Sequence, residues 1–111
     1  MSRNNDDAVQ LLKGIGELYR RNGQSQRALV MLLIAVSVAP DDGLLLRSLV
    51  LAFTDSGDFT RALAALDRLV ALEGESASLL LLRARALWYG ERKDEARQCF
   101  KRYLAARRVA P

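Results

Sequence analysis

Acidic residues stand in adjacent pairs, among them Asp41-Asp42 and Asp94-Glu95, and paired carboxylates can carry general acid–base catalysis. Both pairs, however, precede stretches with helical periodicity, where carboxylates cap backbone N–H groups and favour the helix dipole. The sequence contains no histidine, and Cys99 is its only cysteine. Because the common routes to nucleophilic, metal and nucleotide chemistry need other groups, we predict no catalytic residue, no metal and no cofactor, and a protein that is not an enzyme.

The composition of the 111 residues favours helices, because leucine and alanine dominate while glycine and proline are sparse. An all-α fold is therefore predicted. The formal charge of +4 is uneven, since residues 1–76 hold 8 basic and 10 acidic groups and residues 77–111 hold 9 basic and 3 acidic groups. Such an excess can indicate an acidic partner or nucleic acid, but basic residues near helix ends also complement the helix dipole.

The apolar stretches, such as residues 28–36, are much shorter than the roughly 20 residues that cross a bilayer. The first ten residues, MSRNNDDAVQ, lack the basic start and the following apolar run of a signal peptide. We therefore expect neither membrane insertion nor export by a signal peptide.

Alanines recur every 34 residues, at Ala28, Ala62 and Ala96, each within a similar phrase. Each alanine is followed four residues later by a bulky apolar residue: Leu32, Leu66 and Phe100. A fixed period of this length is typical of stacked structural repeats. Helices are predicted at residues 7–22, 25–38, 43–56, 59–72, 77–90 and 93–108. Ser25 and Asp58 are placed to cap two of them, and Asp41 and Asp42 can cap the one that begins near Gly43.

The pattern resembles the tetratricopeptide repeat, and residues 9–42 match it best, with Gly16, Tyr19, the turn residue Gly23 and Pro40 at the expected places. The resemblance implies three tandem repeats at about 9–42, 43–76 and 77–110 in a single domain, 1–111. It also implies six antiparallel helices stacked in a short right-handed solenoid. In the third repeat the turn glycine, Gly90, comes one residue early, which predicts a turn one residue longer there.

The first helix of each pair lines the concave surface of such a stack, which is the expected binding site. Its candidate positions are the second, fifth, ninth and twelfth of each repeat: Gln10, Lys13, Glu17, Arg20, Leu44, Arg47, Leu51, Thr54, Ser78, Leu81, Arg85 and Trp88. Apolar side chains beside arginines suit an amphipathic, partly acidic peptide or helix. The expected partner-binding residues are Leu44, Arg47, Leu51, Leu81, Arg85, Trp88 and Tyr89. Alternatively, Trp88 and Tyr89 complete the core of the third repeat.

Residues 28–36 form a predicted helix that is apolar on all sides, although a surface helix needs only one apolar stripe. Val30, Met31, Leu33 and Ile34 are therefore candidates for a second apolar interface, covered by a partner or by a second copy. Cover by the first dozen residues is the intramolecular alternative. The helix at 93–108 is amphipathic by contrast, so we expect it to close its end of the stack and leave the other end uncovered.

A narrower resemblance rests on the phrases LLKGIGELYRRNGQSQRA at residues 11–28 and LLLRARALWYGERKDEARQCFKRYLA at residues 80–105. They are similar to the YscY family of small chaperones in bacterial type III secretion. The resemblance implies a chaperone of the bacterial cytoplasm that binds a small secreted partner of the YscX kind and contacts the export gate protein. A structural homodimer or a general protein adaptor is the alternative. Binding to nucleic acid is weakly supported, because Tyr103 in the basic stretch falls at a repeat core position.

Overall fold

The computed structural model describes residues 3–109, which form helices joined by short turns and contain no strand. Six α-helices follow one another: α1 (Arg3–Arg21), α2 (Ser25–Val38), α3 (Gly43–Ser56), α4 (Phe59–Glu73), α5 (Ala77–Tyr89) and α6 (Lys93–Val109). The prediction of an all-α fold of six helices is confirmed. The largest difference from the expected bounds is at α1, which begins four residues earlier than the predicted start at 7 and has Asp6 in its first turn. None of these helices combines the length and the apolar character that crossing a bilayer requires.

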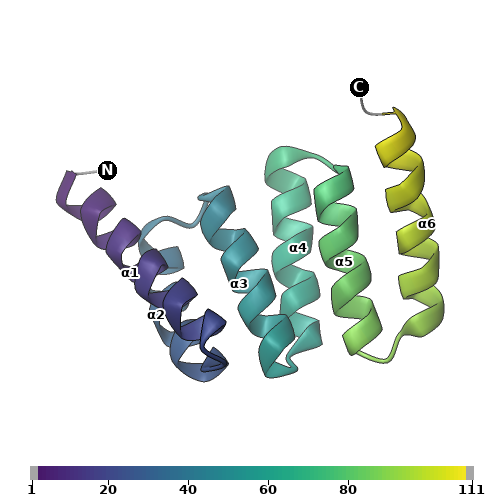
Figure 1. Ribbon diagram of the computed structural model, residues 1–111. Coiled ribbons are helices and arrows are strands. Elements are labelled where there is room, and N and C mark those ends of the chain that lie inside the picture. The colour runs from purple at the N-terminus through teal and green to yellow at the C-terminus, as the bar shows by residue number, and fades with distance from the viewer. Residues whose placement is uncertain (1–2, 110–111) are drawn as a thin grey trace.

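The helices form three antiparallel pairs that stack side by side in chain order (Figure 1). Within the described residues, α3 contacts α1 and α5, whereas α2, α4 and α6 do not contact one another. The helices α1, α3 and α5 therefore make a closed inner layer, and α2, α4 and α6 splay apart in an outer layer. This difference in spacing makes the inner layer the concave side of a short solenoid.

Side-chain caps begin three of the helices. Asp42 accepts a hydrogen bond from the backbone N–H of Leu45 at 3.0 Å, and Asp58 accepts one from Arg61 at 3.2 Å. The predicted caps Asp42 and Asp58 are thus confirmed, and Ser76 caps α5 in the same way. The prediction for Ser25 is wrong, because Ser25 is already the first residue of α2 and the capping position holds Gln24, which makes no side-chain cap.

One left-handed residue ends the first helix of every pair, and it recurs at the 34-residue spacing. Gly23, Gly57 and Glu91 have φ values of 75°, 84° and 65°. The residue after each donates its N–H to a carbonyl five residues back at 2.9 Å, as Arg92 does to Leu87. The third turn, residues 90–92, is one residue longer than the second, residues 57–58, and as long as the first, residues 22–24. The repeat register is nevertheless unbroken, because Glu91 and not Gly90 is the left-handed residue. Gly90 has an ordinary φ of −82° and is needed for space, since a Cβ there would lie 3.0 Å from the Phe59 ring.

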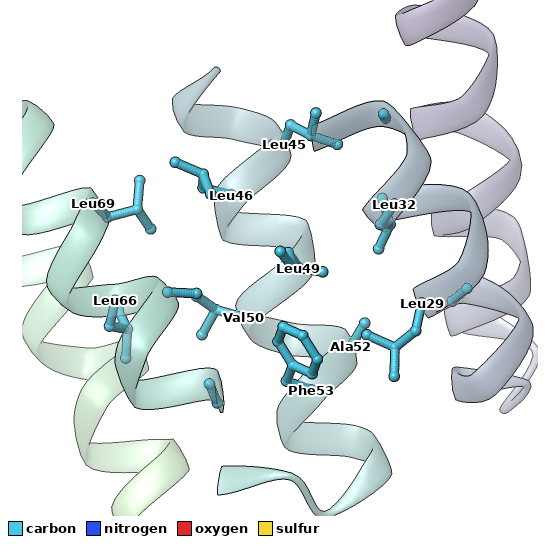
Figure 2. Packing of buried hydrophobic residues seen from close by; sticks show 14 of the residues in the cluster. Leu29, Leu32, Leu45, Leu46, Leu49, Val50, Ala52, Phe53, Leu66 and Leu69 are labelled. Atoms are coloured by element: carbon cyan, nitrogen blue, oxygen red, sulfur yellow. The ribbon is translucent and has the colours of Figure 1, made fainter. Parts of the chain in front are cut away.

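The main apolar core lies on both sides of α3. Figure 2 shows Leu29 and Leu32 of α2 on one side of this helix and Leu66 and Leu69 of α4 on the other. Leucines at 32, 45, 46, 66, 69 and 79 are essentially inaccessible to solvent. Burying a leucine side chain contributes about 2 kcal/mol, so this cluster stabilises the first two pairs and anchors one face of α5.

A second, smaller core cluster holds the third pair together. Its buried members are Leu80, Ala84, Leu87, Ala96 and Cys99. The Cys99 thiol donates a hydrogen bond to the carbonyl of Leu80 at 3.2 Å. Burial raises the pKa of this thiol above its ordinary value, and the charges of Arg83 and Arg102 offset only part of that effect. Cys99 is therefore a structural residue that links α6 to α5.

Candidate protein-binding groove

An apolar hollow of about 470 Å³ lies between α5 and α6, and we call it the α5–α6 groove. Leu81, Trp88 and Tyr89 of α5 and Phe100 of α6 line it, and all four side chains are exposed. Ala84 of α5 and Ala96 of α6, both buried, also line it. Exposed aromatic and aliphatic side chains gathered in one concave place are the usual form of a protein-binding hot spot.

Positive charges surround this apolar surface. The Lys93 ammonium lies 4.7 Å from the centre of the Trp88 ring, and the Arg85 guanidinium lies 5.9 Å from the centre of the Tyr89 ring. Arg97 and Lys101 stand on the α6 side of the groove. Cations over aromatic faces are attracted by the rings and help to hold them in place. They also leave the rim of the groove basic.

A chain of ion pairs crosses the inner layer next to the groove. Asp55 of α3 has one carboxylate oxygen 3.5 Å from Arg20 of α1 and the other 3.8 Å from Arg85 of α5. Arg20 also pairs with Glu17 at 3.0 Å. Partial burial acts to raise the pKa of Glu17, but hydrogen bonds from Arg20 and Ser48 and the nearby positive charges outweigh it, so this pKa is lowered. The network ties the three inner helices together and fixes Arg85 at the edge of the groove.

The comparison with known families agrees with this architecture. A family model described as the tetratricopeptide repeat matches residues 13–72 and, in a second alignment, residues 47–111. The chain belongs to the tetratricopeptide repeat family. No curated protein matches the chain significantly. Tetratricopeptide repeats are protein-interaction scaffolds, so the chain is a protein–protein interaction module.

The tetratricopeptide fold brings together four of the seven residues predicted to bind a partner, namely Leu81, Arg85, Trp88 and Tyr89. The other three do not line the groove. Leu44 is exposed elsewhere on α3, Leu51 is half-buried, and Arg47 pairs with Glu73 at 3.0 Å.

Thr54, another candidate position, is buried and donates a hydrogen bond to the carbonyl of Val50. It is therefore a core residue of the tetratricopeptide stack. Sequence reasoning missed Phe100 and Lys101, which complete the groove on the α6 side. The available signal for them was the pair of aromatic residues Trp88 and Tyr89 next to a basic helix.

The surface of α6 differs from the expected polar end of the tetratricopeptide stack. Phe100 and Leu104 are both exposed on it, so the expectation that α6 closes the stack is wrong. On α2, Val30, Leu33 and Ile34 are exposed as well, whereas Met31 is half-buried. Apolar side chains are thus exposed on α6 at one end of the stack and on α2 beside the second pair, where Val30 and Leu33 line a hollow with Phe53.

Proposed function

We propose that this tetratricopeptide module is a chaperone that binds an apolar segment of a small protein partner in the α5–α6 groove. The observation that carries the proposal is the groove itself, in which Leu81, Trp88 and Phe100 expose apolar surface beside a basic rim. Covering such a surface is favourable, because burial of apolar surface contributes about 25 cal/mol of free energy for each Å² removed from water. A chaperone of this kind shields its partner's apolar segment and its own groove at the same time.

The finer assignment is to the YscY kind of chaperone in type III secretion, with a small secreted partner of the YscX kind and contact with the export gate protein. Its support is the resemblance of residues 11–28 and 80–105. The second of these phrases contains Leu81, Trp88 and Phe100, so the most similar stretch is also the one that builds the groove. The same assignment expects no enzymatic activity and a location in the bacterial cytoplasm.

The test is the absolute molar mass in solution, measured by light scattering after gel filtration, of the protein alone and of the protein co-expressed with a secreted protein of the YscX kind. The proposal expects a stable mixed complex. A well-behaved protein that ignores this candidate would sink the type III assignment and leave the interaction module standing.

A matched pair of variants locates the binding surface. Leu81 in the groove and Leu72 on α4 are 42% and 44% exposed, so Leu81→Glu and Leu72→Glu change equally accessible leucines in different places. Leu81→Glu is expected to weaken complex formation at least about tenfold, whereas Leu72→Glu leaves it unchanged. Equal effects of the two substitutions would count against the groove. Circular dichroism checks that both variants remain folded.

A second candidate function is a structural homodimer, favoured by the apolar patch of Val30, Leu33 and Ile34 on α2. These three side chains lie on one face because they are spaced by three and four residues along the helix. A dimer through this patch is expected to dissociate in Ile34→Glu, with the molar mass falling to that of one chain. A protein of one-chain mass before any substitution removes this candidate.

A further inference from the structure

The residues that line the α5–α6 groove have equivalents in the second pair, and those equivalents are covered. Thr54 and Leu66 lie 34 residues before Trp88 and Phe100, and they are 6% and 0% exposed. Trp88 and Phe100 are 44% and 43% exposed. The second pair is covered at this place by α5, which packs on α4 and α3. The α5–α6 groove is therefore the position that the first helix of a following pair would occupy.

The helices that occupy such positions inside the chain share one stripe of residues. On α3 the stripe contains Leu45 and, seven residues later, Ala52. On α5 it contains Leu79 and Ala86, again seven residues apart. All four are buried in the main core cluster. A helix that fits the α5–α6 groove thus needs a large apolar residue and, two turns later, a small one.

Charge specifies the occupant further. Asp67 on α4 accepts a hydrogen bond from Arg83 on α5 at 2.9 Å, across the junction of the second and third pairs. The residue 34 positions after Asp67 is Lys101, so the sign of this contact is reversed in the α5–α6 groove. Arg85 and Arg97 add positive charge to the same rim. The matching helix therefore carries an acidic residue where α5 carries Arg83.

The first helix of a second copy fits this groove less well. Its stripe at the same register contains Leu11 and Leu18, both exposed. Leu18, however, stands where α3 and α5 have alanine, and Ile15 stands where an acid is needed opposite Lys101. A second copy would therefore bring a side chain that is too large and would leave the basic rim unpaired.

We propose that the α5–α6 groove binds an acidic amphipathic helix of a partner protein, which continues the solenoid as a seventh helix. This inference rests on the proposed partner-binding function and specifies the chemistry of the partner. The recognised segment has a leucine-like residue, a carboxylate four residues later opposite Lys101, and a small residue three residues after that. Binding extends the stack by the same contacts that join its own pairs.

The test uses a peptide taken from the chain itself. Residues 42–56 contain the stripe of Leu45 and Ala52, and Leu49 stands at the place equivalent to Arg83. Two peptides are made, one with Leu49→Glu and one with Leu49→Lys. Both carry a covalent crosslink between positions 46 and 50, because isolated helices of this length are only marginally stable in water. Trp88 is the only tryptophan of the protein, so its fluorescence reports occupation of the groove.

The expected result is a saturable blue shift of Trp88 emission, with the Glu peptide binding at least about tenfold more tightly than the Lys peptide. The Lys101→Glu variant is expected to reverse this preference. Phe100→Glu should abolish binding of both peptides, and its circular dichroism should match that of the parent because Phe100 is exposed. Equal affinities for the two peptides in both the parent and Lys101→Glu would overturn the charge assignment.

Two further outcomes separate this inference from the alternatives. A blue shift that grows with protein concentration alone, and is lost in the double variant Leu11→Glu and Leu18→Glu, would identify a second copy as the occupant and overturn the proposal. If a protein partner is found and Phe100→Glu retains it at full affinity, the groove assignment fails while the chaperone function stands. If the Glu peptide binds selectively but no secreted protein partner binds, the groove assignment stands while the chaperone function fails.

Discussion

Gly16 of α1 lies so close to Leu32 of α2 that a Cβ atom at Gly16 would stand 2.9 Å from the leucine Cγ. Leu32 is completely buried and cannot move aside. Gly16→Ala is therefore expected to lower the free energy of unfolding by about 1–3 kcal/mol, the usual cost of overpacking. The measurement is urea denaturation followed by circular dichroism.

Gly14, two residues away on the same helix, is the matched control. A Cβ at Gly14 would meet no atom within 4 Å. Gly14→Ala should therefore raise the free energy of unfolding by about 0.5–1 kcal/mol, because alanine is the better helix former. Changes of the same sign at both positions would show that the close approach of Gly16 to Leu32 has no energetic consequence.

The left-handed conformation of Glu91 is strained, because only glycine adopts a φ of 65° without cost. Glu91→Gly relieves this strain but also gives the unfolded chain more conformational freedom. The net expectation is that the free energy of unfolding rises by about 1 kcal/mol. The ion pair lost with Lys93 is exposed and contributes little. Gly90→Ala should do the reverse, since its Cβ would contact Phe59. Thermal melts of both variants decide the matter, and a Glu91→Gly melting temperature at or below that of the parent contradicts the prediction.

The Cys99 thiol should be inert in the folded protein. It is buried, it donates to the Leu80 carbonyl, and its pKa is raised by burial, so little thiolate exists at pH 8. We expect alkylation by iodoacetamide at pH 8 to be at least roughly 100-fold slower in the native protein than in urea, where the thiol is free. Mass spectrometry of samples quenched over time measures both rates. Comparable rates would place Cys99 at the surface.

The ion pairs of Glu17 predict how stability depends on pH. A carboxyl whose pKa is lowered on folding stabilises the folded state above its unfolded pKa of about 4.3, and this stabilisation is lost as pH falls through the folded pKa. The parent should therefore lose stability more steeply than Glu17→Gln as the pH falls below about 5. Urea denaturation at a series of pH values provides the comparison. Parallel curves for the two proteins would mean that Glu17 has the same pKa in both states.

The helices and their order could be predicted from the sequence, because the alanines at 28, 62 and 96 mark the same place in each pair. The third turn could not. A glycine in a turn can supply a left-handed φ or simply make room, and the sequence pattern does not distinguish these demands. Gly57 meets the first and Gly90 meets the second. The glutamate that follows Gly90 takes the left-handed conformation because the hydrogen bond from Arg92 to Leu87 requires it there.

The groove could be predicted only in part, for a related reason. Leu81, Arg85 and Trp88 were found because their places on the first helix of a pair face inward. Phe100 was missed and Thr54 was wrongly expected at the binding surface, since the repeat pattern assigns a residue to a position within its own pair. Whether that position is buried depends on what packs on the pair from outside. α5 covers Thr54 and Leu66, while Phe100 at the equivalent place stays exposed.

The smaller core cluster of the third pair has a consequence for the dynamics of the protein. The α6 helix is attached through Ala96 and Cys99 to a cluster of 5 buried residues, whereas the main cluster contains 18. In a solenoid each pair is stabilised by its neighbours, so the amide protons of α6 should exchange with solvent by local opening before those of α3 or α4. The groove is thus built partly on a helix that we expect to be less stable than those of the middle pair. A partner helix that occupies it protects α6 from opening, and recognition at this end is then coupled to the completion of folding.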